Sequence, residues 1–361
     1  MFLNNIQKRE DDNCMIPEPI KVQAIDSRRI EIYWNMQILD GMKNENYTIV
    51  NNGKVCSVFQ WNETEPWYKG TVYQKEQMRT TIYLNEELDI NHLEDAYLQI
   101  TGNICNIEGV RVDTAKKYGI IYNPYYTKFS KCNCGITVKS SESVPDECHE
   151  IAKKIIDSMM VKLDDVTSTM IKYGVELSIY AKEESAYEIP EHRMGYLVMN
   201  RPIEGYGGEW DNPACSISEM NVLRCKTGNY KTRYLDESIL VHEFAHGIHL
   251  IGIEGLEDKT LANEIRSIYE KAKLAGKWPK TYAISNYEEY FATLTTIWFN
   301  VMAESADGSW DGTRGPVNTR EELYEYDRDA YEFFKRIYPE INLPEPWNYS
   351  VDKFDIYGNV R

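Results

Sequence analysis

The sequence lacks three features that would place it in particular classes of protein. No run of about 18 apolar residues, the shortest stretch typical of a membrane helix, occurs in its 361 residues, so no membrane span is expected. An excess of positive charge is also lacking, because 57 acidic residues against 40 Lys and Arg give a formal net charge of -17. That charge repels phosphate backbones, which argues against nucleic acid as a partner. Residues 1–17 are polar and contain no apolar core, so no signal peptide is visible in the chain as given.

Several motifs for other chemistries are absent or incomplete. No Ser or Cys lies in a recognisable nucleophile elbow or signature. Residues 205–208 (Gly-Tyr-Gly-Gly) lack the strand-loop-helix context of a phosphate loop. Residues 307–312 begin like a calcium loop, but its twelfth position is Asn318 rather than Glu, so we expect a turn.

The cysteines favour an oxidising compartment. They number eight, an even count: Cys14, Cys56, Cys105, Cys132, Cys134, Cys148, Cys215 and Cys225. Even counts favour disulfides, so we predict a secreted or cell-surface protein, and a Cys215–Cys225 bridge would be geometrically easy. Cys132, Cys134 and Cys148 could also be metal ligands, but the sequence offers no convincing fourth ligand, and disulfide or free structural cysteines are favoured.

The length is sufficient for two domains, and the pattern changes between them. After a polar segment over 1–18, residues 20–126 contain short alternating segments separated by turn signals, which is typical of strands. Those segments are 20–25, 29–34, 47–50, 55–59, 81–84 and 96–101. We therefore expect an Ig-like or fibronectin-like β-sandwich over 19–130, most simply a spacer or packing module without chemistry.

The remainder of the chain is dominated by helical periods. Amphipathic or apolar helices are expected over 145–162, 164–173, 236–251, 261–275, 287–299 and 320–337. The last of these begins with a capping box, Thr319-x-x-Glu322. A strand is expected over 175–180, and the Gly-, Asn- and Ser-rich residues 205–225 are expected to form a long ordered loop.

The chemistry is concentrated on the predicted helix over 236–251, which Asp236 could cap and Gly252 could end. It is apolar almost all round, so the charged Glu243 is costly there unless it has a role. His242 and His246 are four residues apart and project from one face, the spacing that lets two imidazoles share one tetrahedral metal ion. Glu243 lies beside them, where it could accept a proton from a metal-bound water.

A catalytic zinc needs a third protein ligand, and the sequence leaves alternatives. His249 is about 10 Å along the helix axis from His242, too far to share the metal. Glu264 is close to the thermolysin-like placement but lies on a strongly charged, solvated-type helix. Glu289 is favoured, because its helix is otherwise apolar and a Ser285-x-x-Glu288 capping box would occupy the neighbouring carboxylate.

At this point the sequence resembles a known family. The run His242-Glu-Phe-Ala-His246, followed some forty residues later by Tyr282-x6-Glu289-Tyr-Phe-Ala, looks like the catalytic domain of anthrax lethal factor and its relatives, which include secreted clostridial Pro-Pro endopeptidases. The resemblance implies that His242, His246 and Glu289 bind zinc, that Glu243 is the general base and that Tyr282 polarises the scissile carbonyl. It covers residues 175–300 and departs from the family at Thr293, where a second acidic residue is usual.

We therefore expect an α+β protein in which a zincin-like metallopeptidase domain over 135–361 follows the sandwich. It would hold one Zn2+ per chain and act as a monomer on a peptide or protein substrate. Two alternatives stay open. The first is a binding or adhesion protein on a degenerate peptidase scaffold, and the second is a zinc hydrolase of a non-peptide substrate.

Overall fold

The chain folds into two compact units that are described separately. The computed structural model describes residues 15–59, 70–196 and 203–348, so most of the predicted polar segment over 1–18 lies outside the described residues. Unit 1 comprises Met1–Tyr125 together with Arg193–Met199. Unit 2 comprises Tyr126–His192 and Asn200–Arg361. The protein is α+β, with strands in both units and the longer helices in unit 2.

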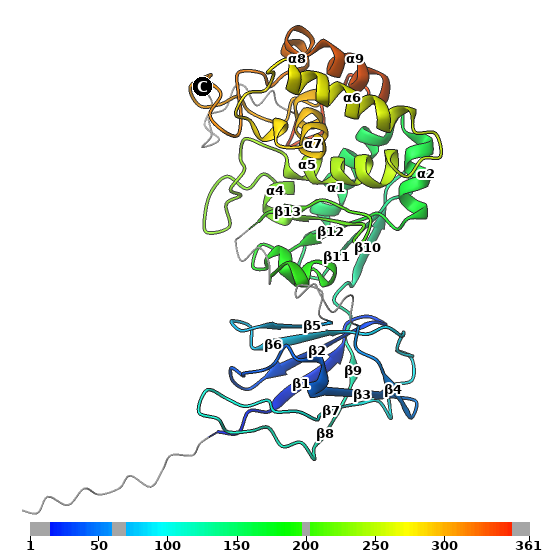
Figure 1. Cartoon of the computed structure of the whole chain (residues 1–361), viewed down its shortest axis with the longest axis vertical. Coiled ribbons are helices and arrows are strands. Elements are labelled where there is room, and N and C mark those ends of the chain that lie inside the picture. The colour runs from blue at the N-terminus through cyan, green and yellow to red at the C-terminus, as the bar shows by residue number, and fades with distance from the viewer. Residues whose placement is uncertain (1–14, 60–69, 197–202, 349–361) are drawn as a thin grey trace, which may run out of the picture. The chain divides into compact units, whose positions relative to one another are not determined.

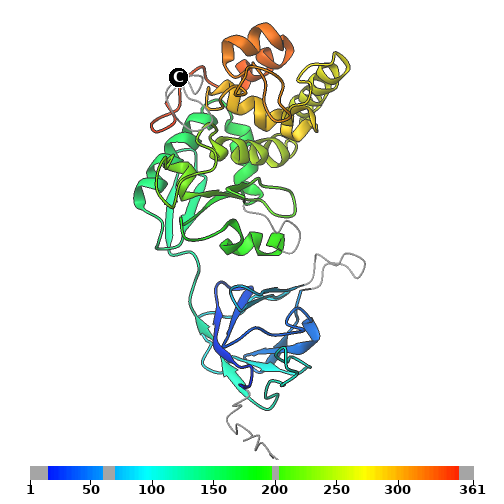
Figure 2. The same ribbon diagram turned by 90° about the vertical axis from the view of Figure 1, so that its left-hand side faces the viewer.

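Unit 1 is built from two sheets (Figures 1 and 2). The first has the order β5-β6-β2-β1-β9 and the second the order β4-β3-β7-β8. The strands are β1 (Pro19–Ala24), β2 (Arg29–Trp34), β3 (Tyr47–Asn51), β4 (Lys54–Cys56), β5 (Thr71–Gln74), β6 (Arg79–Tyr83), β7 (Tyr97–Ile100), β8 (Lys117–Gly119) and β9 (Ile121–Tyr122). Each predicted strand segment in this region overlaps one of them, whereas β5, β8 and β9 were not predicted.

The centre of unit 2 is a sheet of order β10-β11-β12-β14-β13. Its strands are β10 (Lys128–Lys131), β11 (Thr137–Ser140), β12 (Glu176–Tyr180), β13 (Gly205–Tyr206) and β14 (Ala214–Ser218). β11, β12 and β14 run parallel, and β10 and β13 are antiparallel strands at the two edges. The prediction of a loop over 205–225 was therefore wrong. β14 is fully buried, but its small residues (Ala-Cys-Ser-Ile-Ser) give no hydrophobic signal.

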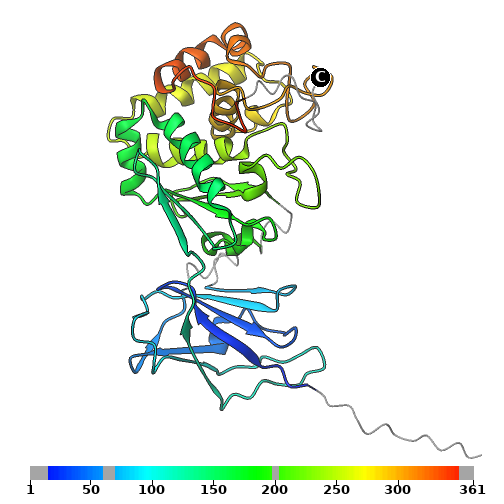
Figure 3. The same cartoon turned by 180° about the vertical axis from the view of Figure 1, so that it is seen from behind.

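Helices lie beside this sheet in unit 2, some against its strands and others against neighbouring helices (Figures 1 and 3). They are α1 (Asp146–Met160), α2 (Asp164–Lys172), α4 (Glu219–Val222), α5 (Ile239–His246), α6 (Thr260–Leu274), α7 (Tyr287–Trp298), α8 (Arg320–Tyr326) and α9 (Arg328–Ile337). The capping box of Thr319 and Glu322 is confirmed. The helix predicted over 320–337 is broken at Asp327, where φ is -133°. The buried carboxylate of Asp327 accepts hydrogen bonds from Trp278 and Tyr290.

Two sequence expectations about the whole chain can be compared with the structure. Among the described helices, none is long and apolar enough to cross a membrane. The seven described cysteines are all free, so the expected Cys215–Cys225 disulfide is absent. Cys215 is fully buried in β14, where its sulfur lies close to Gly208 and Gly247 rather than facing Cys225. The cysteine count therefore no longer supports an oxidising compartment.

Candidate metal centre

Helix α5 is fixed at its start by polar side chains. Ser238 is the N-cap, and its hydroxyl accepts from the backbone N–H of Val241 at 3.5 Å. Asn221 accepts from the N–H of Ile239 at 2.9 Å. The prediction that Asp236 caps this helix was wrong, because Asp236 pairs with Arg314 instead.

The helix also does not end at Gly252. It continues directly into the π-helix η4 (Gly247–Ile253), so the last turns are wider than a regular α-helix. His249 lies in this segment, fully buried and stacked on the ring of Phe291 at 4.7 Å. Within the described part of the chain neither of its ring nitrogens meets a hydrogen-bond partner, and burial lowers the pKa of His249 to about 3. His249 is therefore a packing residue.

Two helices bring three potential ligands together. His242 and His246 come from α5, and Glu289 comes from α7, which packs against it. One ligand atom of each residue lies within 4.8 Å of the other two. The Oε2 atom of Glu289 is 3.1 Å from Nε2 of His242 and 3.6 Å from Nε2 of His246. Residues 47 positions apart in the sequence thus converge on one point.

These separations suit a tetrahedral zinc ion. Ligand atoms bonded at about 2.0–2.1 Å to a common tetrahedral centre lie about 3.3 Å from one another. The two Glu289–His distances fall on either side of that value. Two imidazole nitrogens and one carboxylate oxygen also form a donor set used by catalytic zinc, with one position left for water or substrate. The residues present therefore fit the group.

Glu289 reaches this point because of how α7 begins. The N-cap is Asn286, whose side chain accepts from the N–H of Glu289 at 2.7 Å. The predicted capping box of Ser285 and Glu288 was wrong, since Ser285 donates to the carbonyl of Tyr282 instead. Capping at Asn286 places Glu289 in the first turn, and the following residues of α7 are buried.

Electrostatics within the cluster favour an ionised Glu289. Burial opposes ionisation, but the close imidazoles of His242 and His246 outweigh it and hold the pKa of Glu289 well below its ordinary value. Burial likewise disfavours a charged His242, yet the neighbouring carboxylates of Glu237 and Glu289 hold its pKa above the ordinary value. A bound cation would displace the protons on the ring nitrogens of the two histidines, because the cation and the protons compete for the same atoms.

Glu243 lies on the strand-facing side of α5. A Cβ atom at Gly205 of β13 would be 2.6 Å from its Cγ, so only glycine allows this approach. A Cβ at Gly207 would likewise be 2.6 Å from Cβ of His246. Gly205 and Gly207 therefore allow close packing of the edge segment against α5. Burial raises the pKa of Glu243 above its ordinary value, while the two histidines act in the opposite sense.

Tyr282 lies beside the ligands. Its hydroxyl donates to Oε1 of Glu289 at 3.1 Å, and its ring stacks on that of His242 at a centroid distance of 6.1 Å. The side chain is 47% exposed, so a molecule arriving from solvent can reach it. The structure thus places all five residues singled out in the sequence in one neighbourhood.

The two other glutamates considered from the sequence, Glu264 and Glu288, do not belong to the His242 group. Glu264 on α6 pairs with Arg336 at 2.6 Å and is not a member of the His242 group. Glu288 is the neighbour of Glu289 in the first turn of α7, and it is not in that group either.

A buried ion network lies behind His242 and was not predicted from the sequence. Oε1 of Glu237 is 3.5 Å from Nδ1 of His242, and Oε2 of Glu237 accepts from Arg314 at 3.0 Å. Arg314 also pairs with Asp236, and all three charged side chains are buried. A carboxylate behind a ligand histidine orients the ring. The only sequence signal was an acidic pair before a buried helix, with its cation 77 residues away.

Comparisons with known proteins give weak structural likenesses. No family model matches the chain, and no curated protein matches it. Among solved structures, the Pro-Pro endopeptidase PPEP-2 from Paenibacillus alvei aligns with 13% identity and a TM-score of 0.35, covering 56% of this chain and 97% of that one. The bacterial S-layer protein SbsC, residues 31–844, aligns with 16% identity and a TM-score of 0.26, covering 32% of this chain. The aligned part spans 15% of that S-layer chain.

Proposed function

We propose that this protein is a zinc-dependent endopeptidase whose zinc is bound by His242, His246 and Glu289. The observation that carries the proposal is the convergence of these ligand atoms within 4.8 Å, from two helices that are distant in sequence. The adjoining Glu243 supports a catalytic rather than a structural role, because a structural zinc is usually closed by four protein ligands and needs no base beside it.

The residues of the chain have separate tasks in the proposed hydrolysis. Zinc, when bound, lowers the pKa of water toward neutrality and acts as a Lewis acid. Glu243 takes the proton of the attacking water and then delivers it to the leaving amine, which separates the two products. The Tyr282 hydroxyl donates a hydrogen bond to the oxygen of the scissile carbonyl as negative charge develops on it. Glu237, held by Arg314, keeps the His242 ring in its ligating orientation.

We also propose that unit 1 is an immunoglobulin-like sandwich. Constant-type immunoglobulin domains have strands ABED in one sheet and CFG in the other. With β1, β2, β5 and β6 taken as A, B, D and E, the first sheet of unit 1 has that order. The order β4-β3-β7-β8 of the second sheet corresponds to C, F and G with one added edge strand. This strand order supports the proposed sandwich. The three proposed zinc ligands all lie in unit 2.

The test of the proposed function separates the base from the ligands. The Glu243→Gln variant keeps the side-chain shape and all three ligands but loses the proton acceptor. We expect elemental analysis to find the same zinc content in both proteins, because the variant keeps all three ligands of the His242 site. We expect peptide-library cleavage to fall by roughly two to four orders of magnitude, the range for a lost general base.

The matched control is His242→Ala, which should contain one zinc per chain fewer than wild type and should also lose the activity. Wild-type protein that cleaves no peptide at full zinc supply would refute an endopeptidase. Undiminished cleavage by Glu243→Gln would show that another group is the base.

A further inference from the structure

A second group of potential metal ligands lies in unit 2, on elements that the zinc site does not use. Cys132 and Cys134 are in the turn that joins β10 to β11. The turn is closed by hydrogen bonds from Cys132 N to the carbonyl of Ile136 at 2.9 Å and from Gly135 N to the carbonyl of Cys132 at 3.0 Å. Gly135 has a φ of +97°, a conformation that favours glycine. The turn geometry therefore fixes the two cysteines on one short loop.

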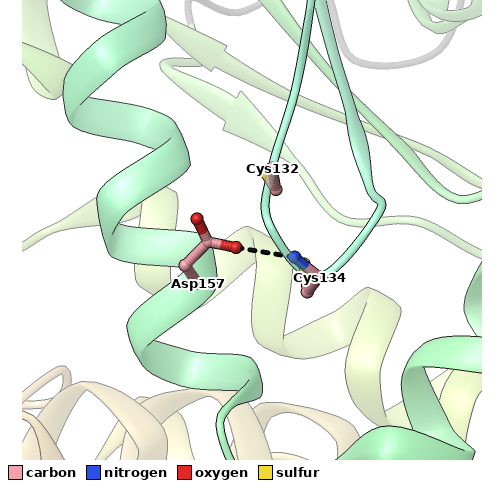
Figure 4. Close-up of side chains that lie close together, drawn as sticks. All are labelled: Cys132, Cys134 and Asp157. Carbon is pink, nitrogen blue, oxygen red and sulfur yellow. Dashed lines mark hydrogen bonds between the residues drawn. The ribbon is translucent and has the colours of Figure 1, made fainter.

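Helix α1 supplies a carboxylate to this turn. Oδ1 of Asp157 accepts from the backbone N–H of Cys134 at 2.9 Å, as Figure 4 shows, and Oδ2 accepts from that of Asn133 at 3.1 Å. Each carboxylate oxygen has two lone-pair sites, so these bonds leave acceptor capacity on both atoms. The sulfur atoms of Cys132 and Cys134 and a carboxylate oxygen of Asp157 all lie within 4.8 Å of one another.

The burial of the group suits a bound ion. Cys132 is 4% exposed and forms the inner side of the group, whereas Cys134 and Asp157 are partly exposed, so an ion can enter from solvent. Cys148, the third cysteine considered from the sequence, is fully buried in α1 and does not belong to the group. Asp157, which was not considered from the sequence, takes the place of Cys148 in the group; it is 23 residues from Cys134 and lies on a helix.

We propose that Cys132, Cys134 and Asp157 form a second metal site, which binds a thiophilic divalent ion such as Zn2+ or Cd2+. Two thiolates select soft or borderline ions over Ca2+ and Mg2+, which prefer oxygen ligands throughout. Both thiols release their protons to solvent on binding. Three protein ligands leave one position of a tetrahedral ion for water. The proposal does not depend on the endopeptidase assignment, because no ligand is shared with the His242 site.

The experiment uses cadmium as the probe, because thiolate-to-cadmium charge transfer absorbs in the ultraviolet and carboxylate or imidazole ligands give no such band. Full-length protein is stripped of metal, kept reduced with a phosphine and titrated with Cd2+. We expect the band to saturate in wild type by two equivalents of Cd2+, because the His242 site can also take up the ion without giving a thiolate band. It should persist in Glu289→Ala, which tests the independence of the two sites.

Variants of the group identify the ligands. Cys134→Ser, at a partly exposed position that tolerates a hydroxyl, should abolish most of the band, and Cys132→Ser should do the same if it folds. Asp157→Asn keeps an acceptor for the backbone N–H groups and should weaken cadmium binding at least tenfold. Cys225→Ser, a partly exposed free cysteine elsewhere in unit 2, is the matched control and should leave the band unchanged.

Two results would overturn the proposal. The first is an undiminished band in the Cys134→Ser variant. The second is the absence of a band in the wild-type protein under reducing conditions. Resistance of Cys132 and Cys134 to alkylation in that protein would show that the two form a disulfide instead of a metal site.

Discussion

Glu264 and Glu289 are both glutamates on helices of unit 2, yet their surroundings give them different chemistry. Glu264 forms an ion pair with Arg336. Solvent reaches both members of the pair, because the side chains of Glu264 and Arg336 are 34% and 55% exposed. Glu289 is 16% exposed and faces two imidazoles. An exposed ion pair contributes little to stability, whereas a partly buried carboxylate beside two ring nitrogens is costly without a cation or protons to share. The surroundings of Glu289 are those of a metal ligand.

Substitution of these glutamates should separate them. Glu289→Ala removes one of three ligand atoms, so we expect zinc affinity to fall by at least two orders of magnitude. Glu264→Ala, the matched control on a neighbouring helix, should leave zinc affinity within a few-fold. Competition with a chromogenic chelator measures both. Loss of zinc from Glu264→Ala with retention in Glu289→Ala would favour the thermolysin-like placement instead.

Tyr282 is the residue whose role depends most on the reaction itself. Removal of one hydrogen bond that strengthens as charge develops should lower kcat by roughly a hundred- to a thousandfold, or about 3–4 kcal/mol. We therefore expect Tyr282→Phe to reduce kcat to this extent with KM and zinc content nearly unchanged. A tyrosine that only packs on His242 would instead leave kcat within a few-fold and lower thermal stability, so both quantities should be measured on the same variant.

How far the site could be predicted differs from residue to residue. His242, His246 and Glu243 were predictable because four-residue spacing on a helix is a local pattern. Glu289 was predictable because a lone carboxylate among apolar residues is unusual. Arg314 was not, since its contacts with Asp236 and Glu237 join segments 77 or more residues apart and no local pattern marks it. Asp157 escaped notice for the same reason.

At the scale of secondary-structure elements, helices with strong periodicity were predicted well, whereas short strands without it were missed. The helices α1, α2, α6 and α7 lie within two residues of their predicted ends at each terminus. The short strands β13 and β14 were missed, because β13 is glycine-rich and β14 carries small polar residues although every one of its residues is buried. Their burial comes from the sheet and from α5, which a window of sequence does not contain. The contact with α5 accounts for Gly205 and Gly207.

Gly207 provides a test of this contact between the edge segment and α5. A methyl group there would lie 2.6 Å from Cβ and 2.8 Å from two ring carbons of His246, and neither the helix nor the ring can move without disturbing the ligand. We expect Gly207→Ala to lower the free energy of unfolding by about 1–3 kcal/mol, the usual cost of overpacking, and to weaken zinc binding. Zinc titration and denaturant unfolding measure the two effects.

Gly119 in β8 offers the matched control for that substitution. No heavy atom outside its immediate neighbours lies within 4 Å of a Cβ built there, so Gly119→Ala should leave stability and zinc binding close to those of wild type. Normal zinc affinity in Gly207→Ala would show that the edge segment gives way and that the contact does not hold His246 in place.

At the scale of the whole molecule, the two units are not consecutive segments of the chain, because unit 1 consists of two separate segments. Residues Arg193–Met199 belong to unit 1, although the chain has already formed three strands of unit 2 before them. Arg193 is 1% exposed and pairs with Glu31, which is 2% exposed and also accepts from Gln23 at 2.8 Å. The sequence prediction of consecutive domains had no means of detecting this return, because the buried pair joins residues 162 positions apart.

This arrangement predicts that the two units respond to different perturbations. All three proposed zinc ligands lie in unit 2, and a ligand present at a thousandfold excess over its Kd stabilises the folded state by about 4 kcal/mol. Removal of zinc should therefore lower the unfolding temperature of unit 2. Arg193→Leu leaves the buried Glu31 without its arginine at position 193 and should destabilise unit 1 by about 3–5 kcal/mol.

Scanning calorimetry of the full chain checks both effects at once. We expect two transitions, of which chelation of zinc shifts one and Arg193→Leu shifts the other. The variant should keep its zinc, because none of its altered contacts involves a ligand of the His242 site. A double perturbation, chelated Arg193→Leu protein, should show both shifts with their single values, as additivity requires for groups without shared partners. A single transition that moves with either change would mean that the units unfold together and that zinc stabilises the whole chain.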